Sequence, residues 1–133
     1  MRNEELGIVE VEMCKKDNAI VDKSKKFALR IIRCYKYLVE NKEYVLSKQM
    51  LRSGTSIGAN VREAQRGQSK ADFYAKLCIA LKEADETSYW LELLNESGFL
   101  PMEKFSGMYA DCDELIKILV SITATQKRSN SNS

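Results

Sequence analysis

Apolar residues recur at every third or fourth position through most of this chain, a spacing typical of amphipathic α-helices and not of strands. The pattern runs through four segments, at about residues 18–41, 43–66, 69–97 and 101–125. Only one proline and six glycines occur among the 133 residues. Because a β-sandwich or barrel needs many turns, and turns need those two residues, the composition argues against both and favours an all-α fold.

Start and stop signals separate the predicted helices. Ser69 followed by Asp72 forms a weak capping box, Gly98 suits a left-handed C-cap, and Pro101 suits a first helical turn. The break near residues 41–42 leaves room only for a tight turn, so we expect the first two helices to be antiparallel neighbours. Short loops between four long helices predict an up-down-up-down antiparallel four-helix bundle.

The bundle accounts for residues 18–125, which we interpret as one domain. Residues 1–17 form an N-terminal arm, either flexible or with a short strand at residues 8–11, and the sequence leaves both open. Residues 126–133 (QKRSNSNS) are polar and are predicted to be a disordered tail. No apolar run approaches the roughly 20 residues that span a bilayer, and the acidic N-terminus is unlike a secretory signal. We expect a cytoplasmic protein without membrane contact.

Histidine is absent. Its absence removes Ser-His-Asp and Cys-His catalysis, histidine zinc ligands and the Glu-x-x-His pairs of di-iron bundles. No Gly-rich phosphate loop occurs either. The four cysteines, Cys14, Cys34, Cys78 and Cys112, form no Cys-x-x-Cys pair, and the last three lie within apolar helix patterns, where we predict small buried hydrophobes. We therefore expect no metal, no cofactor and no enzyme activity.

The net charge of +2 conceals a strong asymmetry along the chain. Residues 42–82 hold eight Lys and Arg against three acids, whereas residues 83–114 hold one lysine against nine acids. The basic half is suited to a polyanion such as a nucleic acid. Alternatively, it is suited to the acidic half of a neighbouring subunit, in head-to-tail contacts that close into rings. Solvated helix faces without a partner are the third interpretation.

The predicted helix at residues 43–66 carries an apolar and a basic stripe on opposite sides. On a helical wheel the apolar positions fall within an arc of roughly 60°. They are Leu46, Met50, Ile57, Val61 and Ala64. Opposite them, four basic residues fall within an arc of about 80°, with only Thr55 and Ala59 between the two pairs. These are Lys48, Arg52, Arg62 and Arg66. We name these four the basic stripe, and interpret it as a docking surface or as a solubilising one.

The middle of the same helix has an unfavourable composition. Ser53-Gly54-Thr55-Ser56 is a poor helix sequence, and Gly58 adds a cost of about 1 kcal/mol relative to alanine. Such a run indicates either close packing by another backbone or a kink. Ser56, Asn60 and Glu63 share one flank, where we predict a polar network at a helix or subunit interface rather than a catalytic site.

The stretch LRSGTSIGANVREAQRGQSKADFYAKLCIALKEADETSYWLELL resembles a known family. It is similar to the four-helix-bundle proteins encoded by intervening sequences within bacterial 23S ribosomal RNA genes, and to the accessory variability proteins of diversity-generating retroelements. The resemblance covers about residues 20–122 and is carried by two motifs. The matching residues are Arg52, Ser56, Ile57, Asn60, Val61 and Glu63, and then Phe73, Ala80, Leu81 and Glu83. Gly58 and Ala64 depart from the proline and glycine that the family often has there.

This resemblance implies a homopentamer of four-helix protomers and nucleic-acid binding, because the retroelement branch is basic and engages RNA or DNA. A reverse transcriptase or a ribosomal component is then a possible partner. We expect a non-catalytic homo-oligomer whose basic helix face contacts RNA or DNA phosphates. The expected contact residues are Lys48, Arg52, Arg62, Arg66, Lys70 and Lys76, and the expected interface or polar-network residues are Ser56, Asn60, Glu63 and Glu83. The alternative is a protein-interaction module whose basic face docks an acidic partner or a neighbouring subunit.

Overall fold

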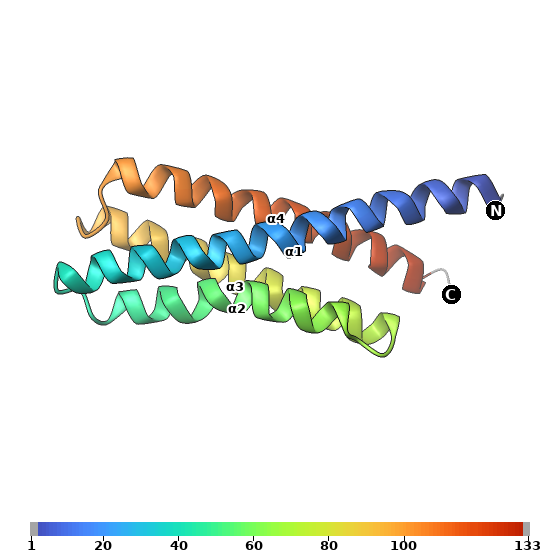
Figure 1. Ribbon diagram of the computed structural model, residues 1–133, viewed down its shortest axis with the longest axis horizontal. Coiled ribbons are helices and arrows are strands. Elements are labelled where there is room, and N and C mark those ends of the chain that lie inside the picture. Colours follow the sequence, from blue (N-terminus) through green and yellow to red (C-terminus); the bar gives the residue numbers. More distant parts are fainter. Residues whose placement is uncertain (1–2, 132–133) are drawn as a thin grey trace.

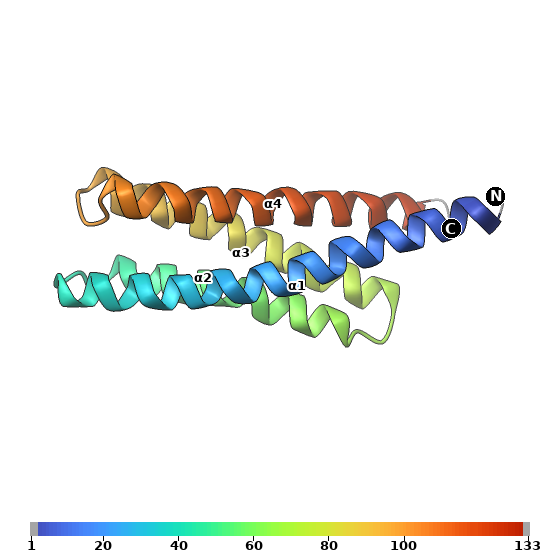
Figure 2. The same ribbon diagram turned by 45° about the horizontal axis from the view of Figure 1, so that its top comes forward.

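The computed structural model describes the backbone of residues 3–131 and the side chains of residues 18–125 and 127. Its elements are four α-helices: α1 (Asn3–Glu40), α2 (Leu46–Gln65), α3 (Lys70–Glu96) and α4 (Met102–Ser131). Successive helices run in opposite directions and lie side by side (Figures 1 and 2). This confirms the predicted all-α, up-down-up-down bundle.

Both outer helices are longer than the predicted bundle. α1 begins at Asn3, so the backbone at residues 8–11 is helical and the alternative of a short strand there was wrong. α4 ends at Ser131, so residues 126–131 of the tail that was expected to be disordered are helical as well. Residues 3–17 contain one glycine and no proline, so nothing there stops the helix. Most side chains of the arm and tail, and all of residues 1–2 and 132–133, lie outside the described part of the chain. Figure 1 shows the two ends projecting past the α2–α3 turn.

The core follows the predicted apolar stripes. On α2, for example, Met50, Ile57, Val61 and Ala64 are buried as expected, whereas Leu46 is only partly covered. Leu100, in the α3–α4 turn, joins the core although it lies outside the predicted helices. The largest side chains with almost no exposed surface are Ile20, Ile31, Leu38, Met50, Ile57, Leu77, Leu91, Leu94, Leu100, Leu115, Leu119 and Ile122.

Close packing explains the small residues in the middle of α2. A Cβ atom added to Gly54 would lie 2.8 to 3.0 Å from three side-chain atoms of Ile31 on α1. A Cβ atom on Gly58 would lie 3.3 Å from the backbone oxygen of Ser24. On another side of α2, the Thr87 hydroxyl of α3 donates to the Ser53 hydroxyl at 2.8 Å, and both residues are buried. The unfavourable stretch therefore lets α2 approach α1 and α3.

The turns use caps that fix how the helices begin and end. The backbone N–H of Asp72 donates to the Ser69 hydroxyl at 3.1 Å, which confirms Ser69 as the cap of α3, and Gly98 has a φ of 87°, which confirms the left-handed stop. In the α1–α2 turn, Lys42 has a φ of 65°, and the buried Glu43 carboxylate accepts from the backbone N–H groups of the first turn of α2. Since Glu43 caps the helix, α2 begins three residues later than predicted, at Leu46.

Across the described residues, no helix combines the length and the hydropathy that a bilayer crossing requires.

Candidate nucleic-acid interface

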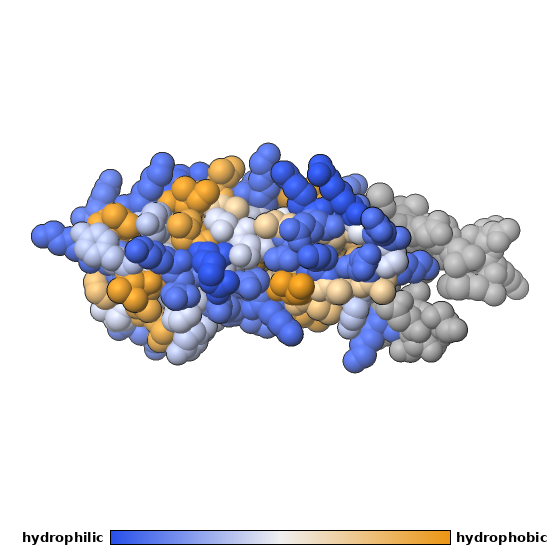
Figure 3. All heavy atoms as spheres, turned by 90° about the horizontal axis from the view of Figure 1, so that it is seen from below, coloured by the Kyte–Doolittle hydropathy of each residue, from blue (hydrophilic) through white to orange (hydrophobic). Residues whose placement is uncertain are grey.

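The basic residues expected to contact phosphates divide into two groups. Lys48, Arg62, Arg66 and Lys70 are exposed, and no ion pair within the described part of the chain involves them. In the face shown in Figure 3, hydrophilic side chains predominate, and hydrophobic atoms gather mainly toward the end with the α1–α2 turn. These four cations are therefore open to solvent in the protomer.

The other two expected contact residues are already ion-paired between helices. The Arg52 guanidinium lies 3.1 Å from a Glu83 carboxylate oxygen and also contacts the Glu86 carboxylate, both on α3. The Lys76 ammonium of α3 lies 2.8 Å from the Glu63 carboxylate of α2. The stripe is thus neutralised in its middle, and its free charge is concentrated at Lys48 and at the C-terminal end of α2.

A groove of about 440 Å³ runs between α1 and α2. Three cations line it: Lys25 from α1, and Arg62 and Arg66 from α2. Glu63 is its single acid among the described residues, and Lys76 engages that carboxylate. We call this the basic groove, defined by Lys25, Arg62 and Arg66. Its small lining residues are Ser24, Ala28, Thr55, Gly58 and Ala59.

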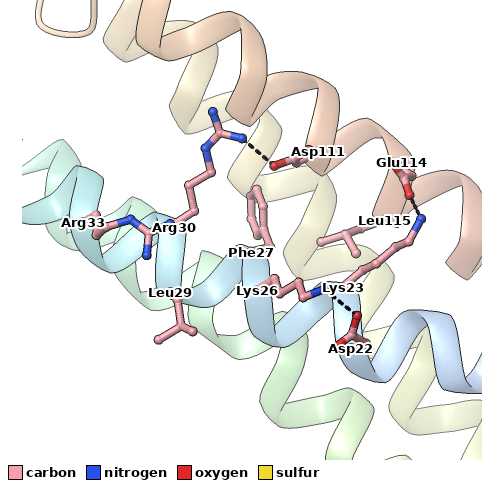
Figure 4. A pocket seen from close by; sticks show the side chains of 10 residues that line it. All are labelled: Asp22, Lys23, Lys26, Phe27, Leu29, Arg30, Arg33, Asp111, Glu114 and Leu115. Carbon is pink, nitrogen blue, oxygen red and sulfur yellow. Dashed lines mark hydrogen bonds and ion pairs between the residues drawn. The ribbon is translucent and has the colours of Figure 1, made fainter.

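A larger hollow, of about 550 Å³, lies between α1 and α4. Figure 4 shows Phe27 and Leu115 pointing into it, with Arg30 and Lys23 reaching from α1 toward α4. Three ion pairs cross or border it, and they use all of its acidic lining residues. They are Arg30–Asp111 at 2.7 Å, Lys26–Asp22 at 3.0 Å and Lys23–Glu114. The remaining cation is Arg33. Because its charges largely cancel, this hollow attracts a polyanion less than the basic groove does.

The four expected polar-network residues do not join into one network. The Ser56 hydroxyl donates to the backbone oxygen of Arg52 at 2.6 Å, and the Asn60 amide donates to the backbone oxygen of Ser56 at 2.9 Å, so both bond within α2. Glu63 and Glu83 instead form the α2–α3 ion pairs described above. No three Cys, Asp or Glu side chains in the described part of the chain are placed to hold a metal ion.

The described thiols are free, and two of them are deeply buried. Burial raises the pKa of Cys34 to about 11 against the opposing effect of Lys104 and Arg30. Burial, with nearby aspartates, raises the pKa of Cys112 to about 12. Both are thus protonated at neutral pH and unreactive. Cys78 is only partly buried, so its predicted burial was wrong, and Cys14 lies outside the described side chains.

Sequence reasoning missed Lys25. This lysine lies on a flank of α1, and the apolar pattern of α1 alone does not show that this flank faces α2. The signal that finds it is the pairing of α1 with α2 at Gly58, where the backbone of Ser24 approaches closely. Once that register is known, Lys25 must lie beside Arg62.

Comparison with known proteins gives the family. The model of the 23S rRNA-intervening sequence proteins matches residues 16–121, most of the chain. The chain belongs to the 23S rRNA-intervening sequence protein family. A solved member from Bacteroides thetaiotaomicron, a protein of unknown function from the S23 ribosomal protein family, is 56% identical over 82% of this chain and 98% of its own, with a TM-score of 0.80. No curated protein matches the chain.

In this 23S rRNA-intervening sequence protein, the residues that carry the resemblance lie on the surface described above. Arg52, Ser56, Asn60 and Glu63 all lie on α2, while Glu83, on α3, binds Arg52. These residues therefore include the Arg52–Glu83 ion pair and the Glu63 carboxylate that Lys76 engages. The basic groove lies beside it. No catalytic family is indicated by these matches.

Proposed function

We propose that this protein is a non-catalytic homo-oligomer that binds the phosphates of RNA or DNA through the basic groove. The observation that carries the proposal is the convergence of Lys25, Arg62 and Arg66, from two helices, on one groove whose single acid is engaged by Lys76. Lys70, at the start of α3, and Lys48, near the start of α2, extend the positive surface beyond the basic groove. Contacts of this kind neutralise phosphates and are independent of sequence.

Exposed apolar side chains support self-association. Tyr44, Val45, Phe99 and Met102 are each 40% or more exposed, and they lie in or next to the α1–α2 and α3–α4 turns, at the end of the bundle away from the α2–α3 turn (Figure 1). Exposed apolar side chains gathered in one place are typical of a protein–protein contact. The family resemblance implies five subunits, and we propose a pentamer on that basis.

One observation favours the alternative, a protein-docking module. Asp85 and Glu96 on α3 are exposed, and no ion pair within the described residues uses them. An acidic α3 and a basic groove on one protomer are complementary surfaces. In this alternative the groove of one subunit binds the acidic helix of the next, and no nucleic acid is bound.

Binding to a structured RNA at two salt concentrations tests the proposal. Three phosphate contacts predict that affinity falls about 40-fold between 50 and 200 mM salt. The Arg62→Glu/Arg66→Glu variant should lose binding. A matched control, Lys82→Glu/Lys117→Glu, changes the net charge equally at exposed positions outside the groove and should retain most of it.

No binding at low salt would reject nucleic-acid binding, and equal loss in both variants would reject the basic groove as its site. Light scattering at the same two salt concentrations gives the oligomeric state. An oligomer that dissociates in high salt and in the Arg62→Glu/Arg66→Glu variant would favour docking between subunits. A monomer under all conditions would reject the homo-oligomer.

A further inference from the structure

We propose that the basic groove selects double-stranded nucleic acid over single strands. This inference rests on the proposed function and names its substrate class. The shared ligand chemistry is the phosphate backbone of a duplex, and RNA and DNA duplexes are its two sources. The inference is carried by what lines the groove, by where the exposed aromatic side chains lie, and by the spacing of the free cations.

No aromatic side chain is among the described residues that line the groove. The most exposed aromatic residues lie elsewhere. Tyr44 and Phe99 are in the α1–α2 and α3–α4 turns, at the end of the bundle opposite to the α2–α3 turn that follows Arg66 (Figure 1). Tyr89 lies on α3 and is 53% exposed. A strand seated between Lys25 and Arg62 therefore meets no stacking platform.

This absence matters because single-strand binding depends on stacking. Proteins that bind single strands combine a cationic groove with aromatic side chains, and each stacked base adds substantially to affinity. Without stacking, a flexible strand gains only phosphate contacts and must still be ordered. A duplex has its bases already stacked and offers one charge per roughly 1.7 Å of axis. Phosphate contacts alone therefore favour the duplex.

The lining of the groove favours the same ligand. Ala28, Gly58 and Ala59 project little, and the backbone of Ser24 lies so near Gly58 that a Cβ there would be 3.3 Å from its oxygen. Small side chains and closely packed backbone therefore line the groove, and none of its described lining residues is an aromatic ring on which a splayed base could stack. Lys25 and Arg62 line the same groove from two helices, so a phosphate ridge can lie between them.

The spacing of the free cations also suits a stiff ligand. Because Glu83 and Glu86 neutralise Arg52, the free charge on α2 divides between Lys48 and Arg62. These positions are 14 residues apart, or about 21 Å along the helix axis. A duplex, with a persistence length of about 50 nm, holds its phosphates at fixed separations over this span. A flexible single strand must instead be ordered between Lys48 and Arg62, which costs conformational entropy.

The test measures fluorescence anisotropy with four probes: a 20-base-pair RNA duplex, the DNA duplex of the same sequence, and one unstructured strand of each. At about 50 mM salt we expect at least one duplex to bind ten-fold or more tightly than its own strand. Single strands bound as tightly as the duplexes would overturn this inference and leave the proposed function intact. No binding by any of the four probes would reject both.

A pair of adjacent lysines locates the bound duplex. Lys25 lines the basic groove, whereas Lys26 lines the α1–α4 hollow and pairs with Asp22. Lys25→Gln should reduce the slope of log affinity against log salt by about one, and Lys26→Gln should leave it unchanged. An unchanged slope in Lys25→Gln, or an equal decrease in both variants, would place the duplex outside the groove and overturn the inference.

Discussion

The cap at the start of α2 makes the stability of this bundle depend on one carboxylate. Glu43 is 6% exposed, and its carboxylate accepts from the backbone N–H groups of Val45, Leu46 and Ser47 at 3.2, 2.9 and 2.5 Å. The Ser47 hydroxyl also donates to the Glu43 backbone oxygen at 2.8 Å. The side chain thus satisfies three N–H groups that have no partner within the helix.

Replacing Glu43 by glutamine removes the charge but preserves the shape. Hydrogen bonds to a charged group are worth about 1.5–3 kcal/mol and neutral ones about 0.5–1.5. The side-chain amide introduced by this substitution would also turn its own N–H groups toward the backbone N–H donors. We therefore expect Glu43→Gln to lower the free energy of unfolding by about 2 kcal/mol at pH 7, which corresponds to a decrease in Tm of about 5–10 °C.

The same contact predicts a pH dependence. Burial alone raises the pKa of the Glu43 carboxyl, but the hydrogen bonds from Leu46, Ser47 and Val45 outweigh it and hold the pKa below its ordinary value of 4.5. The stabilisation is therefore fully present above about pH 4.5, and is lost as the pH falls through the lower value in the folded protein. The difference between the wild-type protein and Glu43→Gln should shrink over that range.

Urea unfolding followed by circular dichroism, at pH 7 and pH 3, measures both effects. Other carboxylates titrate equally in the two proteins, so the difference between them isolates Glu43. The matched control is Glu40→Gln, an exposed glutamate at the end of α1, which should change stability by less than about 0.5 kcal/mol. Equal stability of Glu43→Gln and the wild-type protein at pH 7, or a difference that persists unchanged at pH 3, would refute the capping role.

Two further predictions test the packing around α2. Gly54→Ala should lower the free energy of unfolding by about 1 kcal/mol, because the clash with Ile31 outweighs the helix propensity gained. The control is Gly107→Ala on α4, which should be neutral or stabilising because only the flexible end of the Arg30 side chain lies near the added methyl group. Thermal unfolding gives both signs, and stabilisation by Gly54→Ala would contradict the close approach. Thr87→Val should cost about 1–3 kcal/mol in urea unfolding because it removes the hydrogen-bond partner of the buried Ser53 hydroxyl. A change below about 0.5 kcal/mol would show that this bond contributes little.

Local patterns in the sequence predicted the fold well. The Ser69 cap, the Gly98 stop and the apolar stripe of α2 each depend on residues within a few positions of one another. Where a side chain makes a local contact that the residue pattern does not reveal, the predicted helix boundary differs from the observed one. Glu43 fits the residue pattern of a first helical turn, but its side chain folds back as a cap, so α2 begins at Leu46.

The candidate site could be predicted only in part, because it depends on register between helices. The wheel placed Arg52 and Arg62 on one stripe, but it could not show that Arg52 faces Glu83 while Arg62 faces solvent. Pairing two helices face to face leaves their relative shift undetermined, and a shift of one turn moves each side chain about 5.4 Å. Lys25 was missed for the same reason.

Lys25 also distinguishes a binding surface from ordinary helix stabilisation. Arg62 lies in the last turn of α2 and Arg66 is its C-cap residue, where the helix dipole favours cations whether or not anything binds. The dipole effect falls off within one turn, so it does not account for a lysine in the middle of α1. A cation from α1 that points into the same groove, with Lys76 engaging the local acid, concentrates positive charge at a cost in self-repulsion. That arrangement gains most when an anionic partner offsets the repulsion.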